Sequence, residues 1–131
     1  MRKVVKVKKK PAKSPRKRII KELDYLASHV CRKIWQGKCG ICGGIGNQAH
    51  HYFGKKAYPW LRFDLDNLIL LDWQCHICRV HHEGESERAR DAIINRIGQD
   101  RFDQLKERSS KHQKLSLLDL DRIKEELTVM L

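Results

Sequence analysis

Four of the five cysteines form two Cys-x-x-Cys pairs, a spacing that is typical of zinc sites. Cys39 and Cys42 make the first pair, and Cys75 and Cys78 make the second, with 32 residues between the two pairs. Each pair can give two thiolates to one tetrahedral Zn2+ ion at about 2.3 Å, and the glycines after Cys39 and Cys42 permit the tight turn required. We therefore predict a structural zinc ion that joins two segments of a small core.

Five histidines lie between the cysteine pairs or close to the second pair: His50, His51, His76, His81 and His82. Hydrolysis of a phosphodiester requires a base that deprotonates water and a cation that stabilises the developing negative charge. Neighbouring strand residues point to opposite faces, so one imidazole of the His50-His51 pair can bind the cation while the other faces the water. This pattern predicts one catalytic divalent cation, Mg2+ or Mn2+, with Zn2+ or Ni2+ as alternatives that suit imidazole.

The segments around these residues alternate between helical and strand patterns. Apolar residues recur every three or four positions over residues 15–35, which predicts an amphipathic helix. Strands are expected at residues 48–53 and 67–71, and helices at residues 85–97 and 99–108. Ser116 stands three residues before Asp119, which is similar to a capping box and predicts the start of a last helix. The predicted fold class is α+β, with a small two-stranded element among helices.

Positive charge is concentrated at the N-terminal end of the chain. The 131 residues carry a formal net charge of +12, and residues 1–21 hold eleven of the 28 basic residues and no acidic residue. Such a segment buries too little apolar surface to fold alone, so we expect a basic disordered arm at residues 1–15 and one domain at residues 16–131. The arm suits a nucleic-acid backbone. The basic residues expected to contact it are Lys8, Lys9, Lys10, Arg16, Lys17 and Arg18.

The order of the motifs resembles that of the HNH nucleases, which carry a ββα-metal site. More narrowly, one motif and a following stretch are similar to the Rap (NinG) recombination nucleases of lambdoid phages. The motif is formed by His51, Tyr52, Pro59, Leu61, Arg62, Phe63 and Asn67, and the stretch is Arg96-Ile97-Gly98-Gln99 before a helical tail. The likeness covers about residues 37–130. It implies a zinc-stapled ββα-metal core, flanked by an N-terminal helix and by C-terminal helices.

The resemblance also implies roles for single residues. His51 would be the general base, His50 a ligand of the catalytic metal, and Asn67 the residue whose amide ties the loop back and aims His51. Arg79 would hold a phosphate of the substrate. Further contacts with the DNA backbone are expected from the loop between the strands, through Lys55, Lys56, Arg62 and Trp60.

The chain departs from the family pattern at the second cysteine pair, and two alignments follow. In the family, the metal-binding residue of the helix directly follows the last cysteine, whereas here Arg79 follows Cys78. In the first alignment Cys75 and Cys78 both bind zinc, and His82, or else His81, completes the catalytic site one helical turn later.

In the second alignment Asp72 takes the place of a cysteine. Asp72 and Cys75 are then the second pair of zinc ligands, Cys78 is not a ligand, and His76 becomes the ligand of the catalytic metal. We favour the first alignment, because four thiolates make a better structural zinc site than three thiolates and a carboxylate.

The residues and the resemblance together predict a DNA endonuclease that acts on branched recombination intermediates such as Holliday junctions. The selectivity for branches comes from the resemblance alone. One alternative is an HNH nicking or homing endonuclease on duplex DNA, and another is a non-catalytic zinc module that binds nucleic acid. A junction enzyme must cut two strands, so a homodimer through the C-terminal helices is expected.

No stretch approaches the roughly 18 consecutive apolar residues of a membrane span, and no secretory signal is visible. We therefore expect no membrane partner and a cytoplasmic location, in the host cell if the protein is encoded by a phage. Cysteines in a reducing compartment also favour metal binding over disulfides.

Overall fold

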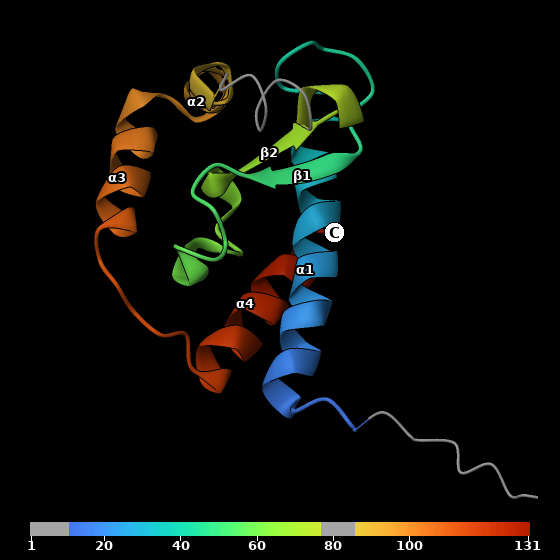
Figure 1. Cartoon of the computed structure of the whole chain (residues 1–131), viewed down its shortest axis with the longest axis vertical. Helices are drawn as coiled ribbons and strands as arrows, with labels where there is room; N and C mark the ends of the chain where they lie inside the picture. The colour runs from blue at the N-terminus through green and yellow to red at the C-terminus, as the bar shows by residue number, and fades with distance from the viewer. Residues whose placement is uncertain (1–10, 77–85) are drawn as a thin grey trace, which may run out of the picture.

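The computed structural model describes residues 11–76 and 86–131 (Figure 1). Most of the predicted basic arm lies outside these residues, so the structure does not test it. The site residues that also lie outside them are Lys8, Lys9, Lys10, Cys78, Arg79, His81 and His82.

The first helix, α1, spans Pro15–Ile34 as its periodicity predicts. The Ser14 hydroxyl accepts a hydrogen bond from the Lys17 amide, and proline fits the first turn because its missing N–H would have no helical partner there. The apolar stripe of α1 faces the core with Leu23, Ala27, Val30 and Cys31. The helix ends where Gln36 and Gly37 adopt positive φ angles and lead the chain toward the first cysteine pair.

The two strands form an antiparallel hairpin, as expected. β1 spans Gln48–His51 and β2 spans Leu68–Leu71, with His50 opposite Ile69 and His51 opposite Leu68. Both strands are shorter than predicted. β1 ends at His51, and Asn67 closes a short 3-10 turn, Leu65–Asn67, ahead of β2.

Three helices follow the hairpin: α2 at Ser86–Ile97, α3 at Gln99–Ser109 and α4 at Leu117–Val129. Gly98, with a φ of 88°, makes the sharp turn between α2 and α3. The predicted capping box of α4 is confirmed, because the Ser116 and Asp119 side chains each bond the other residue's backbone N–H.

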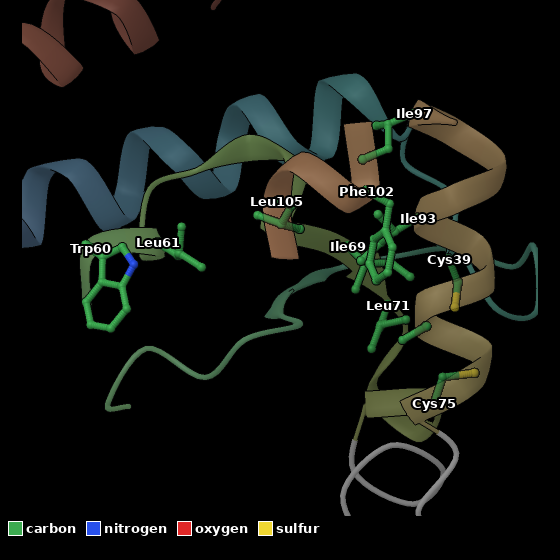
Figure 2. Close-up of a cluster of buried hydrophobic side chains, with 11 residues drawn as sticks. Cys39, Trp60, Leu61, Ile69, Leu71, Cys75, Ile93, Ile97, Phe102 and Leu105 are labelled. Carbon is green, nitrogen blue, oxygen red and sulfur yellow. The ribbon is translucent and has the colours of Figure 1, made fainter. Parts of the chain in front are cut away.

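The hairpin lies between two groups of helices, with α2 and α3 on one side and α1 and α4 on the other (Figure 1). Each face of β2 therefore supplies a separate core cluster. Ile69 and Leu71 pack with Ile93, Phe102 and Leu105 from α2 and α3 (Figure 2). The other cluster joins the hairpin to α1 and α4, through Leu68, Leu70, Leu23, Val30 and Leu120.

The fold is thus a mostly helical α+β arrangement around one hairpin. Among the described residues, no helix combines the length and the apolar character that a membrane crossing requires.

Candidate metal centre and histidine site

Three cysteines and one aspartate come together at the base of the hairpin. One ligand atom from each of Cys39, Cys42, Asp72 and Cys75 lies within 4.8 Å of the other three. Cys39 and Cys75 are buried at the edge of the core cluster, where Figure 2 shows both of their sulfur atoms. Four donors of this kind fit a tetrahedral Zn2+ ion, so the cluster is a candidate zinc site.

The loop that carries the first cysteine pair is folded by its own backbone and by glycines. The Cys39 amide donates to the Gly44 carbonyl at 2.7 Å, and the Gly43 amide donates to the Cys39 carbonyl at 2.9 Å. Gly43 has a φ of 74°, a conformation that glycine adopts without strain. The Gly40 amide bonds to the Leu70 carbonyl at 2.8 Å, which anchors the loop to β2.

Asp72 connects the end of β2 to the helical turn that carries Cys75. Its Oδ1 accepts a hydrogen bond from the Cys75 amide at 2.6 Å, and its Oδ2 lies 2.7 Å from the Cys42 sulfur. The hydrogen bonds from Cys42 and from the Cys75 amide lower the pKa of Asp72, so its carboxylate is ionised at neutral pH. Burial raises the pKa of Cys75 to about 12.

The described residues therefore match the zinc ligands of the second alignment, in which Asp72 belongs to the site. Cys78, the ligand of the favoured alignment, lies outside the described residues. The choice between the two alignments stays a prediction, and zinc content can decide it.

His76, one residue after Cys75, meets His50 of β1. The centroids of the two imidazole rings are 5.1 Å apart, and the rings are inclined by 66°. Two imidazoles on one ion reach a similar separation, because each nitrogen lies about 2.1 Å from the ion. This pair is a second place where a cation would fit. His81 and His82, the other candidate helix ligands, lie outside the described residues.

His51 ends β1 and lies on the other face of the strand from His50. Its Nε2 is 2.9 Å from the carbonyl oxygen of Arg62, which can only accept a hydrogen bond. Nε2 must therefore carry a proton, and Nδ1 keeps its lone pair in the neutral ring. Burial lowers the pKa of His51, which favours that neutral form. A ring in this state can accept a proton at Nδ1.

Asn67 is fully buried, with 0% of its surface exposed, and its amide ties the loop between the strands. Its Oδ1 accepts from the Phe53 amide at 2.7 Å, while its Nδ2 donates to the carbonyls of Phe53 and Leu61 at 3.1 Å. The loop tie implied by the resemblance is thus present. Because the Arg62 carbonyl that holds His51 directly follows Leu61, Asn67 also supports the position of His51.

The four loop residues expected to contact DNA differ in their accessibility. Lys55 and Lys56 are exposed. The Arg62 guanidinium makes two hydrogen bonds to the Asp24 carboxylate, at 2.8 and 2.6 Å. Trp60 is only 8% exposed, and its indole N–H donates to the Arg108 carbonyl at 2.8 Å, so its observed role is packing.

The basic residues Arg16, Lys17 and Arg18 lie in the first turn of α1, at the opposite end of the helix from the end near the hairpin (Figure 1). Lys17 and Arg18 are exposed. Arg16 is partly buried and donates to the Leu115 carbonyl at 2.6 Å, which joins the start of α1 to the segment before α4. Any contact of these residues with DNA would therefore be separate from the histidines.

Sequence reasoning missed the ion pairs that fix the loop. Asp66 contacts Arg96, Arg101 and Arg108, and Asp64 bonds to Arg108. The pair between Asp24 and Arg62 was also missed. The only sequence signal was acidic residues next to apolar stretches, and their partners are 30 or more residues away.

Comparison with known proteins gives a family. A family model described as "Bacteriophage Lambda NinG protein" matches residues 1–130. The chain belongs to the NinG family. This confirms the resemblance to the NinG family and extends it from residues 37–130 to residues 1–130, which include the basic arm. The nuclease activity and the wider likeness to HNH nucleases stay proposals.

Curated NinG relatives come from several phages. The chain is 31% identical to the ninG protein of Escherichia phage 933W over 109 residues, which cover 80% of this chain and 53% of that protein. It is 29% identical to the ninG protein of Escherichia phage lambda, again over 109 residues, with 80% and 52% covered. The chain thus spans about half the length of these NinG relatives. No solved structure gave a significant match.

Proposed function

We propose that this NinG-family chain is a metal-dependent DNA endonuclease of the HNH type that hydrolyses phosphodiester bonds in branched DNA. One observation carries the proposal: His51, held by the Arg62 carbonyl with Nδ1 left as an acceptor, stands beside His50, whose ring faces His76. A proton acceptor and a pair of imidazoles that can bind a cation, brought together where β1 ends and the turn after β2 begins, are the groups that phosphodiester hydrolysis needs.

The residues have separate tasks in this mechanism. His51 would accept the proton of the attacking water at Nδ1 while its Nε2 proton stays on the Arg62 carbonyl. The Arg62 backbone and the Asn67 amide would keep the ring in that orientation. His50 and His76 would hold the divalent cation, which supplies stabilisation of the negative charge on the phosphate. Arg79, Lys55 and Lys56 would contact neighbouring phosphates.

The zinc cluster has a structural task in this proposal. Cys39, Cys42, Asp72 and Cys75 would bind Zn2+ and fasten the first loop to the end of β2. Since His76 follows Cys75 directly, this fastening would also position His76 against His50. The fit of three thiols and a carboxylate to zinc supports this assignment.

Cleavage of a four-way junction and of linear duplex DNA with Mg2+ or Mn2+ tests the proposal. We expect the junction to be cut in preference to the duplex. We also expect His51→Ala to slow single-turnover cleavage by at least about 100-fold, because general-base catalysis contributes 10²–10⁴-fold. His112→Phe removes an exposed imidazole but keeps an aromatic ring against Trp60, so it is the matched control and should cleave at the wild-type rate.

Other outcomes would select one of the alternatives. Cleavage of duplex DNA alone would remove the branch preference and favour a nicking or homing enzyme. A zinc-loaded protein that binds DNA but cuts neither substrate with either metal would be a non-catalytic zinc module.

We also propose that the chain acts as a homodimer, since two strands must be cut in a junction. Apolar side chains on the outer face of α4 support this, because Leu118 is 79% exposed and Val129 is 86% exposed. Analytical ultracentrifugation should give a dimer on junction DNA. A monomer both free and on the junction would remove the dimer.

A further inference from the structure

A groove of about 670 Å3 lies between α1 and α4, among residues that the histidine site does not use. Its charged lining consists of Lys13, Arg18, Lys21, Lys124 and Glu22, and Tyr25 gives it an aromatic wall. The groove thus combines four cations, one carboxylate and one aromatic ring.

The positive charge of the groove is only partly neutralised within the described part of the chain. Glu22 bonds to Lys124 at 2.7 Å, and no described carboxylate forms an ion pair with Lys13, Arg18 or Lys21. Lys13 and Lys21 line the same groove, and the nearby Lys21 ammonium lowers the pKa of Lys13. Asp121 lies near Arg18 on the neighbouring surface, and it makes no ion pair with Arg18. An anionic ligand would relieve this repulsion.

Tyr25 indicates which kind of anion fits. Its side chain is 65% exposed although it is aromatic, and its ring lies 4.3 Å from that of His29. Proteins that bind single nucleic-acid strands pair a positively charged groove along the backbone with aromatic rings on which bases stack. An acidic peptide would use the cations but has no base that could stack on the exposed face of the Tyr25 ring.

The groove lies on another side of α1 from the residue that contacts the histidine site. Asp24 of α1 bonds to Arg62, whose carbonyl oxygen is 2.9 Å from His51 Nε2. Arg18 lies six residues before Asp24, about 9 Å along the helix axis, and Arg18 and Tyr25 are both turned away from Asp24 by roughly 100–120° around the helix. A strand in the groove would therefore be a different segment of the nucleic acid from the phosphate at the histidines.

We propose that the groove between α1 and α4 binds a second segment of nucleic acid, with its phosphates on Lys13, Arg18 and Lys21 and an unpaired base against Tyr25. The identity of the ligand as DNA rests on the proposed function. Two contact sites on one chain fit a substrate with unpaired bases at a branch, because one segment can occupy the histidine site while another lies along α1.

Fluorescence anisotropy with a labelled single-stranded oligonucleotide tests the proposal, with the zinc-loaded full chain and no added Mg2+ or Mn2+. Removal of one cation that neutralises a phosphate should reduce the slope of log K against log salt by about 0.7. We expect Lys13→Gln/Lys21→Gln to reduce the slope by about 1.4, because two such cations are removed. The matched control is Lys106→Gln/Lys111→Gln, which removes the same charge from the region of α3 and should leave the slope unchanged.

Tyr25 gives a second measurement. Tyr25→Ala should weaken single-strand binding by about 5- to 150-fold, which corresponds to the stacking of one base. Tyr25→Phe should bind like the wild type, because the ring is kept.

Three outcomes would overturn the proposal. One is an equal change of slope in both double variants, and another is unchanged affinity in Tyr25→Ala with its thermal unfolding temperature intact. The third is equally tight binding of poly-glutamate, which would make the groove a surface for acidic proteins. Failure of cleavage with groove binding retained would instead refute only the proposed nuclease function.

Discussion

The side-chain amide of Asn67 bonds to both backbone groups of Phe53, with its Oδ1 2.7 Å from the amide nitrogen and its Nδ2 3.1 Å from the carbonyl oxygen. It thereby replaces a pair of strand hydrogen bonds at the point where the hairpin opens into its loop. The loop returns to β2 through this one fully buried amide.

We expect Asn67→Ala to lower the free energy of unfolding by about 3 kcal/mol, because buried backbone groups lose their partners. Urea unfolding of the zinc-loaded protein measures the change. Asn95→Ala, at an exposed position of α2, should change the free energy by less than about 0.5 kcal/mol. Equal stability of the two variants would mean that the amide does not hold the loop.

Zinc content distinguishes the two alignments of the metal centre. Because Asp72 lies with Cys39, Cys42 and Cys75, we expect Asp72→Ala to bind less zinc than the wild type. Cys31→Ala should keep its zinc, since Cys31 packs in the other core cluster. Metal analysis after dialysis against a weak chelator makes the comparison.

Cys78→Ser should keep its zinc if the carboxylate completes the site. Loss of zinc from Cys78→Ser, with full zinc in Asp72→Ala, would instead restore the four-thiolate arrangement that the cysteine spacing favours.

If Arg62 contacts DNA as proposed, Asp24 would compete with the phosphate for its guanidinium. Its carboxylate holds the guanidinium through two hydrogen bonds, and both side chains are partly exposed. We expect Asp24→Asn to bind DNA about two- to five-fold more tightly at low salt, the equivalent of one partly exposed ion pair. Glu107→Gln removes the same charge from α3 and is the control. If the two variants bind DNA alike, Arg62 does not contact the backbone.

The capping box of α4 should make stability depend on pH. The Ser116 backbone amide and hydroxyl lower the pKa of Asp119 below its ordinary value of 3.8. The ionised Asp119 carboxylate therefore stabilises the folded state at neutral pH. This stabilisation is lost as the pH falls through the lowered pKa. We expect Asp119→Asn to be less stable than the wild type at pH 7, with the difference shrinking toward pH 3.

Thermal unfolding of both proteins over this pH range measures the difference. Ser116→Ala should lower the free energy of unfolding by about 1 kcal/mol, which is typical of a lost helix cap. A difference between the wild type and Asp119→Asn that stays constant with pH would exclude the carboxylate as its source.

The helices could be predicted from the sequence because their signals are local. α1, α2 and α3 begin and end within one residue of the predicted bounds, and α4 begins directly after its capping residue Ser116. Apolar periodicity and caps act over a few residues, so no knowledge of the tertiary fold was required. The strand ends were less accurate, since the Asn67 side chain competes there with strand pairing.

The geometry of the site could be predicted only in part. The resemblance predicted that the Asn67 amide holds the loop between the strands. The cysteine spacing predicted three of the four clustered ligands, Cys39, Cys42 and Cys75. The second alignment placed Asp72 with the cysteines and His76 with His50 at one metal, although it was not the favoured alignment. The meeting of Asp24 with Arg62 depends on how distant segments pack, which no local pattern encodes. The burial of Trp60 has the same origin, because α3 and the segment after it cover its ring.

Both faces of β2 are buried, so the polarity of its side chains does not determine which residues of β1 and β2 pair with each other. A strand with one polar face resists slipping by one residue, because a slip would turn that face inward. Leu68-Ile69-Leu70-Leu71 offers no such penalty, since every position is apolar. Correct pairing must then depend on features outside the strand, such as Gly46, where an added Cβ would lie 2.6 Å from the Leu70 side chain. The close approach of the cysteine loop to Leu70 would thus set the register of the hairpin during folding.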